Sequence, residues 1–207
     1  MAGQQKLHAV QILPANYAER LTLDLQADKK EALKVNGIGL AVMLVMALGM
    51  HFVVPAQTLF SRSAGIGLFG LRLGVLGAAY IAYIVLHEWT HGVTMRHYGA
   101  QRVRFGFTGL YAYAGSEEDY FDKSSYRVIA LAPMVVWGVI FALLQFAVPR
   151  EWFWVVWLLQ IGNISGSAGD VYVTCRLARM PADLLVRDTG VRMTVFCASS
   201  AVQNDPS

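Results

Sequence analysis

Four long apolar runs constrain this chain more than any other feature of its sequence. They cover residues 35–54, 73–97, 128–148 and 152–177, and the first and third end directly before Pro55 and Pro149. Each run reaches the roughly 20 residues that a helix needs to cross a hydrocarbon core of about 30 Å. The sequence therefore predicts a mainly α-helical, polytopic membrane protein with about four transmembrane helices.

The composition supports this class and excludes others. Hydrophobic residues make up 56% of the chain and charged residues 15%, whereas soluble domains carry roughly 25% charged residues. Buried helices of a soluble protein would need more polar surface around them than this composition supplies. The net charge is only +3, without the dense basic stripe that a phosphate backbone requires. We therefore expect a lipid bilayer around the chain and no nucleic acid partner.

Lysine and arginine residues predict the orientation of the spans. Near the span ends, twelve of them fall on one side and three fall on the other. Because positive charge is concentrated on the cytoplasmic side, we expect a multi-pass protein of the cytoplasmic membrane with both termini in the cytoplasm. The chain then divides into a cytoplasmic segment 1–34, a membrane-embedded domain 35–180 and a cytoplasmic tail 181–207. The twelve residues are Lys29, Lys30, Lys34, Arg96, Arg102, Arg104, Lys123, Arg127, Arg176, Arg179, Arg187 and Arg192, and the three are Arg62, Arg72 and Arg150.

The loop between the second and third runs has the alternating pattern of short strands. Residues 103–107 and 110–114 alternate on either side of Thr108-Gly109, which predicts a small β-hairpin on the cytoplasmic surface. The acidic stretch 116–119 that follows is expected to be a solvated turn. Residues 191–196 in the tail have a further strand-like pattern.

The second apolar run contains a motif with direct chemical meaning, His87-Glu88-Trp89-Thr90-His91. Residues four apart share one face of a helix, so His87 and His91 can bind a single Zn²⁺ ion. Glu88 lies beside the pair and could take a proton from a zinc-bound water. Ionisable residues within a membrane span usually face an interior or a water-filled cavity and have a function. The alternative is that these residues end the span and face the cytoplasmic interface.

A catalytic zinc site needs a third protein ligand, and the fourth run offers Asp170. It is the only carboxylate within residues 152–177, and small residues precede it from Gly162 onward. His91 lies five residues before Arg96 and Asp170 lies six before Arg176, so both belong at a similar depth if the two spans run in the same direction. A helix–helix hydrogen bond is the alternative role for Asp170. Two histidines and one carboxylate also suit iron or cobalt.

Two neighbours of the motif have plainer interpretations. Tyr83 lies one turn before His87 on the same face and could orient it, but a packed aromatic side chain is the favoured interpretation. His97 lies six residues after His91 and points to a different sector of the helix, so we expect it not to be a ligand.

Four stretches of the chain carry a resemblance to known proteins. An HExxH motif in one span with an aspartate in a later glycine-rich span resembles intramembrane metalloproteases of the site-2 protease type. A bacterial zincin peptidase family of unknown function is similar over most of residues 20–190. The stretches are residues 23–30 with Asn36, residues 87–92, residues 126–133 and residues 163–170.

The resemblance implies roles for individual residues of the membrane-embedded domain. His87, His91 and Asp170 would be the zinc ligands, Glu88 would be the catalytic base, and Asn163 would help to bind substrate. The chain departs from the site-2 protease pattern in two places. Asp170 lies in Gly-Asp-Val where that pattern has Leu-Asp-Gly, and Gly166 stands where a proline is expected.

These features predict a zinc-dependent intramembrane endopeptidase that cleaves a membrane-associated protein or peptide substrate. The hairpin would offer an edge strand with which an unwound substrate segment can pair. Two other hypotheses stay open: a non-catalytic metal-binding membrane protein and a small metal transporter. Glu88 argues against the first because metal binding alone does not require it, and the lack of repeated halves argues against the second.

Overall fold

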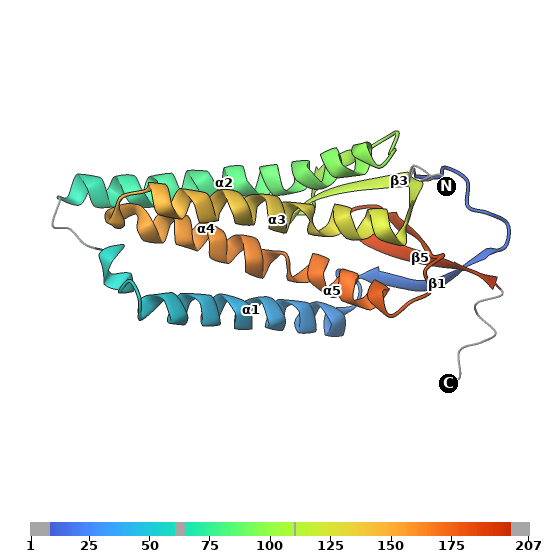
Figure 1. The fold of residues 1–207 in the computed structure, drawn as a ribbon, viewed down its shortest axis with the longest axis horizontal. Helices are drawn as coiled ribbons and strands as arrows, with labels where there is room; N and C mark the ends of the chain where they lie inside the picture. The colour runs from blue at the N-terminus through green and yellow to red at the C-terminus, as the bar shows by residue number, and fades with distance from the viewer. Residues whose placement is uncertain (1–8, 61–64, 110, 200–207) are drawn as a thin grey trace, which may run out of the picture. The chain divides into compact units, whose positions relative to one another are not determined.

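A computed structural model describes residues 9–60, 65–109 and 111–199 of the chain (Figure 1). The described chain is mainly helical, with a small antiparallel sheet. Its elements in order are β1 (Tyr17–Asp24), α1 (Lys29–His51), η1 (Ala56–Thr58), α2 (Ile66–His97), β2 (Arg104–Phe107), β3 (Ala112–Asp122), α3 (Lys123–Ala147), η2 (Arg150–Trp152), α4 (Phe153–Gly166), α5 (Ala168–Ala178), β4 (Leu185–Asp188) and β5 (Arg192–Ala198).

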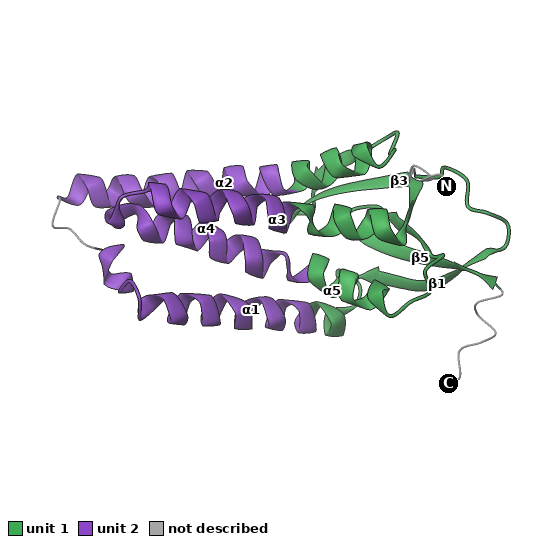
Figure 2. Ribbon diagram, in the orientation of Figure 1, with its two compact units in different colours: residues 1–32, 88–132, 170–207 green, residues 33–87, 133–169 purple. Residues whose placement is uncertain are grey.

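The chain divides into two compact units (Figure 2). The sheet unit comprises residues 1–32, 88–132 and 170–207, and the helical unit comprises residues 33–87 and 133–169. Helices α1, α2 and α3 are continuous across this division and contribute residues to both units.

The described residues contain three helices that are long and apolar enough to cross a membrane: α1, α2 and α3. At most 22% of the most apolar window of each helix is buried. Large apolar side chains such as Val45, Leu48 and Phe146 are instead exposed. Outward apolar side chains are typical of helices that have lipid as their solvent. These helices match the predicted spans 35–54, 73–97 and 128–148.

The fourth predicted run, residues 152–177, is not one continuous helix. The structure divides it into α4, with 14 residues, and α5, with 11, separated at Ser167. Gly166 and Ser167 both have low helix propensity, and the backbone N–H of Ser167 donates to the carbonyl of Asn163 as α4 ends. The prediction of a single helix was therefore wrong here. Its consequence is that Asp170 lies in the first turn of a new helix.

Small residues allow the helices of the helical unit to approach closely. A Cβ atom on Gly39 of α1 would lie only 2.9 Å from the carbonyl oxygen of Ser165 on α4. A Cβ atom on Gly162 of α4 would lie 2.6 Å from the hydroxyl oxygen of Tyr80 on α2. Close packing of this kind stabilises helix association in a membrane, because lipid provides no hydrophobic driving force between helices.

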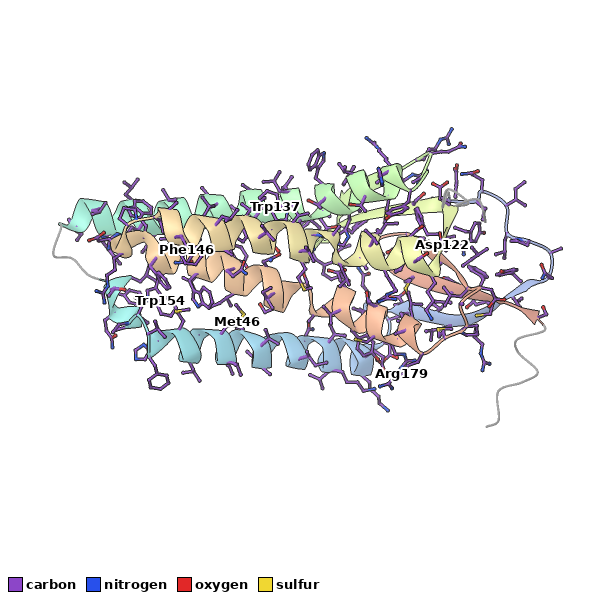
Figure 3. The ribbon with its side chains drawn as sticks, viewed as in Figure 1. Met46, Asp122, Trp137, Phe146, Trp154 and Arg179 are labelled. Carbon is purple, nitrogen blue, oxygen red and sulfur yellow. The ribbon has the colours of Figure 1, made fainter. Side chains whose placement is uncertain are left out.

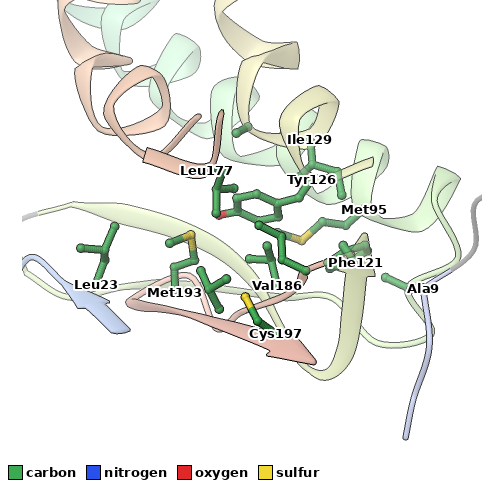
Figure 4. Packing of buried hydrophobic residues seen from close by; sticks show 14 residues of the cluster. Ala9, Leu23, Met95, Phe121, Tyr126, Ile129, Leu177, Val186, Met193 and Cys197 are labelled. Carbon is green, nitrogen blue, oxygen red and sulfur yellow. The ribbon is translucent and has the colours of Figure 1, made fainter. Parts of the chain in front are cut away.

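The sheet unit contains one five-stranded antiparallel sheet in the order β1-β5-β4-β3-β2. Helix residues Met95, Tyr126, Ile129 and Leu177 pack with strand residues in one buried cluster (Figure 4). The strand residues of that cluster are Leu23, Phe121, Val186, Met193, Val195 and Cys197. Period-two alternation therefore places one face of the sheet against helices within this unit.

The structure confirms the hairpin predicted from residues 103–114, apart from residue 110, which lies outside the described residues. Strand β2 pairs with β3 from Arg104 opposite Gly115 to Phe107 opposite Ala112. The strand predicted at 191–196 is β5, which spans Arg192–Ala198. Strand β1 within the predicted segment 1–34 was not expected.

The acidic stretch 116–119 is not a turn, and only Glu117 and Glu118 in it are exposed, so that prediction was wrong in part. It lies within β3, and Ser116 and Asp119 are fully buried. The Asp119 carboxylate accepts hydrogen bonds from the Ser116 hydroxyl at 2.5 Å, the Gln101 backbone N–H at 3.1 Å and the Gln11 side chain at 3.1 Å. These donors satisfy a charge that would otherwise be costly to bury.

Asp122 caps the N-terminus of α3, where it is labelled in Figure 3. Its carboxylate accepts from the backbone N–H groups of Ser124 and Ser125 at 2.9 and 3.1 Å, and from both hydroxyls. Partial burial alone would raise the pKa of Asp122, but these four hydrogen bonds hold it below the ordinary value of 3.8. The cap therefore stabilises the helix more strongly when the carboxylate is charged.

Asp122→Ala is expected to lower the free energy of unfolding near neutral pH by about 1 kcal/mol, the usual cost of losing an N-cap. Because the folded-state pKa is lowered, this contribution is complete above the ordinary aspartate pKa and disappears as pH falls through the lowered value. Thermal unfolding in detergent, followed by tryptophan fluorescence, would measure the difference. Asp183→Ala, at an exposed position, is the control. An equal gap at neutral pH and at about pH 2 would contradict the charged cap.

Candidate metal centre

One continuous helix, α2, presents three of the predicted site residues. His87 and His91 are one turn apart and so share a face, and Glu88 lies beside them. The fourth residue, Asp170, comes from the first turn of α5, three residues after the break at Ser167.

The structure brings the three predicted ligands together. His87, His91 and Asp170 each offer a ligand atom, and these atoms lie within 4.8 Å of one another. The Nε2 atom of His91 lies 3.6 Å from Oδ1 of Asp170. Two ligands of a tetrahedral zinc ion with bonds of about 2.0–2.1 Å lie roughly 3.4 Å apart. Two imidazoles and one carboxylate are also a known catalytic zinc donor set, so both spacing and chemistry fit this ion.

His91 is oriented by a backbone carbonyl that a proline has released. Its Nδ1 atom lies 3.0 Å from the carbonyl oxygen of Ile129 on α3. That oxygen would normally accept from the N–H of residue 133, but Pro133 has no N–H. Since a carbonyl only accepts, Nδ1 of His91 carries the hydrogen and Nε2 has the lone pair. Nε2 is the atom that lies near Asp170.

Pro133→Ala is expected to weaken zinc binding about 10-fold, the lower end of the range for loss of an outer-shell partner. The new N–H would compete with His91 for the Ile129 carbonyl, while the helix itself would not lose stability because alanine is the better helix former. Competition with a chromophoric chelator would measure the affinity. Pro149→Ala, before η2, is the matched control. A zinc affinity equal to that of the wild type would contradict this role of Pro133.

His87 contacts Tyr83, which in turn contacts Asn163. The hydroxyl of Tyr83 lies 2.9 Å from Nδ1 of His87 and 3.0 Å from Oδ1 of Asn163. Tyr83 is also a buried, packed aromatic residue, which is the interpretation that the sequence favours. Asn163 is fully buried. Its predicted part in substrate binding stays a prediction.

The site lies in a part of the chain that matches a known protein family. A family described as "Putative zincin peptidase" matches residues 80–185, which is 106 of the 207 residues. The chain belongs to this zincin peptidase family. Comparisons with curated proteins and with solved structures found no match.

Family membership supports a metallopeptidase and implies zinc as its metal. The zincin peptidase match contains every predicted site residue: Glu88, His87, His91, Asp170 and Asn163. It also contains Tyr83 and Ile129, which contact His87 and His91, and Pro133.

Glu88 lies beside the edge of the predicted hairpin. The backbone of Ala114 on β3 lies near its carboxylate. Gly92 makes this approach possible, because a Cβ atom there would lie 2.4 Å from the ring of Phe105, the cross-strand partner of Ala114. The glycine after the HExxH motif of this zincin peptidase therefore lets β2 pack against α2.

Sequence reasoning missed a half-buried carboxylate from the tail, Asp188, which lies three residues beyond the zincin peptidase match. Its Oδ2 accepts from the Tyr126 hydroxyl at 2.5 Å, and its Oδ1 accepts from the Gly190 N–H at 2.7 Å. Burial raises the pKa of Asp188 above its ordinary value, and the nearby charge of Asp170 raises it further. One acidic residue at the end of a short tail strand gives no signal in the sequence that it binds a tyrosine 62 positions earlier.

Proposed function

We propose that this protein is a zinc-dependent intramembrane endopeptidase of the site-2 protease type, which cleaves membrane-associated protein or peptide substrates. The observation that carries the proposal is the convergence of the His87, His91 and Asp170 ligand atoms beside Glu88. The motif lies on α2, one of the three helices able to span a membrane. A soluble peptidase would have no need to place its chemistry on such a helix.

Zinc held by His87, His91 and Asp170 would polarise the scissile carbonyl and lower the pKa of the attacking water toward about 7. The Glu88 carboxylate would accept the proton from that water and later deliver it to the leaving amine. The Ile129 carbonyl would keep Nε2 of His91 directed at the metal through the reaction.

A substrate segment would bind in extended form along β3. Strand β4 pairs with β3 only from Ser116 onward, so β2 is the one strand of the described chain that pairs with residues 112–115. A substrate strand added beside Ala112 and Ala114 would expose its peptide bonds next to Glu88. Ala112→Pro would remove a backbone donor from this edge and should abolish cleavage, whereas Ala112→Val should retain it. Undiminished cleavage by the proline variant would reject strand pairing as the binding mode.

The membrane topology is part of the same proposal. Both termini and the sheet unit would lie in the cytoplasm, on the side that collects most lysine and arginine residues. Helices α4 and α5 would form a broken fourth span, which is tolerated where the irregular backbone is buried in protein. Fusions of a fluorescent protein to either end would fluoresce if that end is cytoplasmic. A fusion that is made and inserted but does not fluoresce would show that its end lies outside the cytoplasm, which would contradict the proposed orientation.

The test is proteolysis by the purified full-length protein in detergent or proteoliposomes. Unfolded casein and a model single-span protein would serve as substrates, and mass spectrometry would identify new N-termini. Cleavage should require zinc and stop with 1,10-phenanthroline but not with its non-chelating 1,7 isomer. Zinc-loaded protein that moves zinc into vesicles without cutting either substrate would support a transporter instead. Zinc binding with neither activity would support a non-catalytic protein.

A further inference from the structure

Three hydrogen bonds in the helical unit form a chain that ends on His87. Asn163 of α4 donates from Nδ2 to the carbonyl oxygen of Met134 on α3, at 2.9 Å. Tyr83 donates its hydroxyl hydrogen to Oδ1 of Asn163, at 3.0 Å. The same hydroxyl oxygen lies 2.9 Å from Nδ1 of His87, one turn later on α2.

The carbonyl group of Met134, at one end of this series of hydrogen bonds, determines which group donates and which accepts in each bond. A carbonyl oxygen only accepts, so Asn163 must present its NH₂ group to Met134 and its oxygen to Tyr83. The amide oxygen also only accepts, so the hydroxyl hydrogen of Tyr83 points at Asn163. The phenol oxygen is then the acceptor for His87, whose Nδ1 carries the hydrogen. Nε2 is therefore the nitrogen of His87 with a lone pair to give to a metal.

Burial makes this chain strong and specific. Asn163 is fully buried, and Tyr83 is 6% exposed in a cluster with Phe141, Val156 and Leu159. A hydrogen bond in such surroundings is electrostatically stronger than in water, and an unpaired polar group there is costly. Gly138 provides the space, because a Cβ atom at that position would lie 3.3 Å from Nδ2 of Asn163.

We propose that Tyr83 and Asn163 are positioning residues that hold the His87 ring in its Nδ1–H tautomer and direct Nε2 toward the metal. The proposal rests on the zinc site of the proposed function, but the tautomer itself can be observed without metal. It also gives Asn163 a defined task that differs from contact with substrate.

The first measurement is nitrogen NMR of the full-length, metal-free protein in detergent, labelled with ¹⁵N only in its five histidines. At about pH 8 an ordinary imidazole, with a pKa of about 6.5, is neutral, so each ring shows its tautomer. We expect His87, assigned through His87→Gln, to be the Nδ1–H form in the wild type. In Tyr83→Phe, which keeps the ring but removes the hydroxyl, the His87 signal should move toward a mixture of tautomers.

The second measurement is the zinc dissociation constant, with Co²⁺ absorption as a report on ligand geometry. Tyr83→Phe and Asn163→Ala should each weaken zinc binding 10- to 100-fold and alter the Co²⁺ spectrum. Because both act through one ring, the double variant should lose less affinity than the product of the two single losses. Tyr80→Phe removes the same atom from the same helix and is the matched control.

The outcomes separate this proposal from the proposed function. A His87 tautomer and a zinc affinity that both stay as in the wild type would overturn it, even if Tyr83→Phe lowered the melting temperature. A wild type that holds the Nδ1–H tautomer but binds no zinc would reject the zinc peptidase while the positioning of the ring by Tyr83 stands.

Discussion

Asp170→Asn is expected to remove zinc from the protein. Asparagine keeps the size of the side chain but removes the charge that a metal site needs, so affinity should fall by more than the roughly 100-fold upper limit for outer-shell partners. His87→Ala should do the same, since each removes one of three predicted ligands. Metal content of the detergent-purified protein would fall from about one zinc per chain to near zero.

Two controls make the zinc result specific. His97→Ala removes a histidine from the last turn of the same helix, and Asp183→Asn removes a carboxylate from an exposed position. Both should keep full zinc content. Zinc lost in His87→Ala but retained in Asp170→Asn would leave the HExxH motif in place and remove Asp170 from the site.

Glu88→Gln is expected to keep zinc and lose peptide hydrolysis. Glutamine fills the same space but cannot accept a proton, and general acid–base catalysis contributes about 10²- to 10⁴-fold to rate. Turnover should fall by that factor while zinc content stays near one per chain. Glu117→Gln on β3, where an exposed carboxylate lies 3.1 Å from Arg104, is the matched control. Undiminished cellular function with Glu88→Gln would favour the non-catalytic hypothesis.

Local patterns predicted much of the site. The spacing of His87 and His91 follows from helix periodicity alone, and Asp170 was identified as the lone carboxylate of an apolar run. The sequence also contained Pro133, but a proline in a span does not reveal which donor takes the released Ile129 carbonyl. That partner depends on how α3 packs with the end of α2 in the sheet unit.

Long-range pairing explains what local patterns missed. Strand β1 pairs with β5 across most of the chain, from Tyr17 opposite Ala198 to Asp24 opposite Arg192. The acidic stretch of β3 looked solvated because its donor Gln11 lies 108 residues away from Asp119. The apolar composition of residues 152–177 likewise predicted a single span. It does not show the break at Ser167, which depends on the local backbone preference of Gly166 and Ser167.

The strand order of the sheet has a consequence for biosynthesis. Strand β5 lies between β1 and β4, yet Arg192 at its start is 101 residues after His91. At ribosomal speeds of about 5–20 residues per second, this strand is made roughly 5–20 s after the HExxH motif. A partly translated chain therefore carries the motif before the surrounding sheet can close. If the chain is the proposed peptidase, hydrolysis would begin only after this last strand is made, when helix α2 with its HExxH motif has long been synthesised.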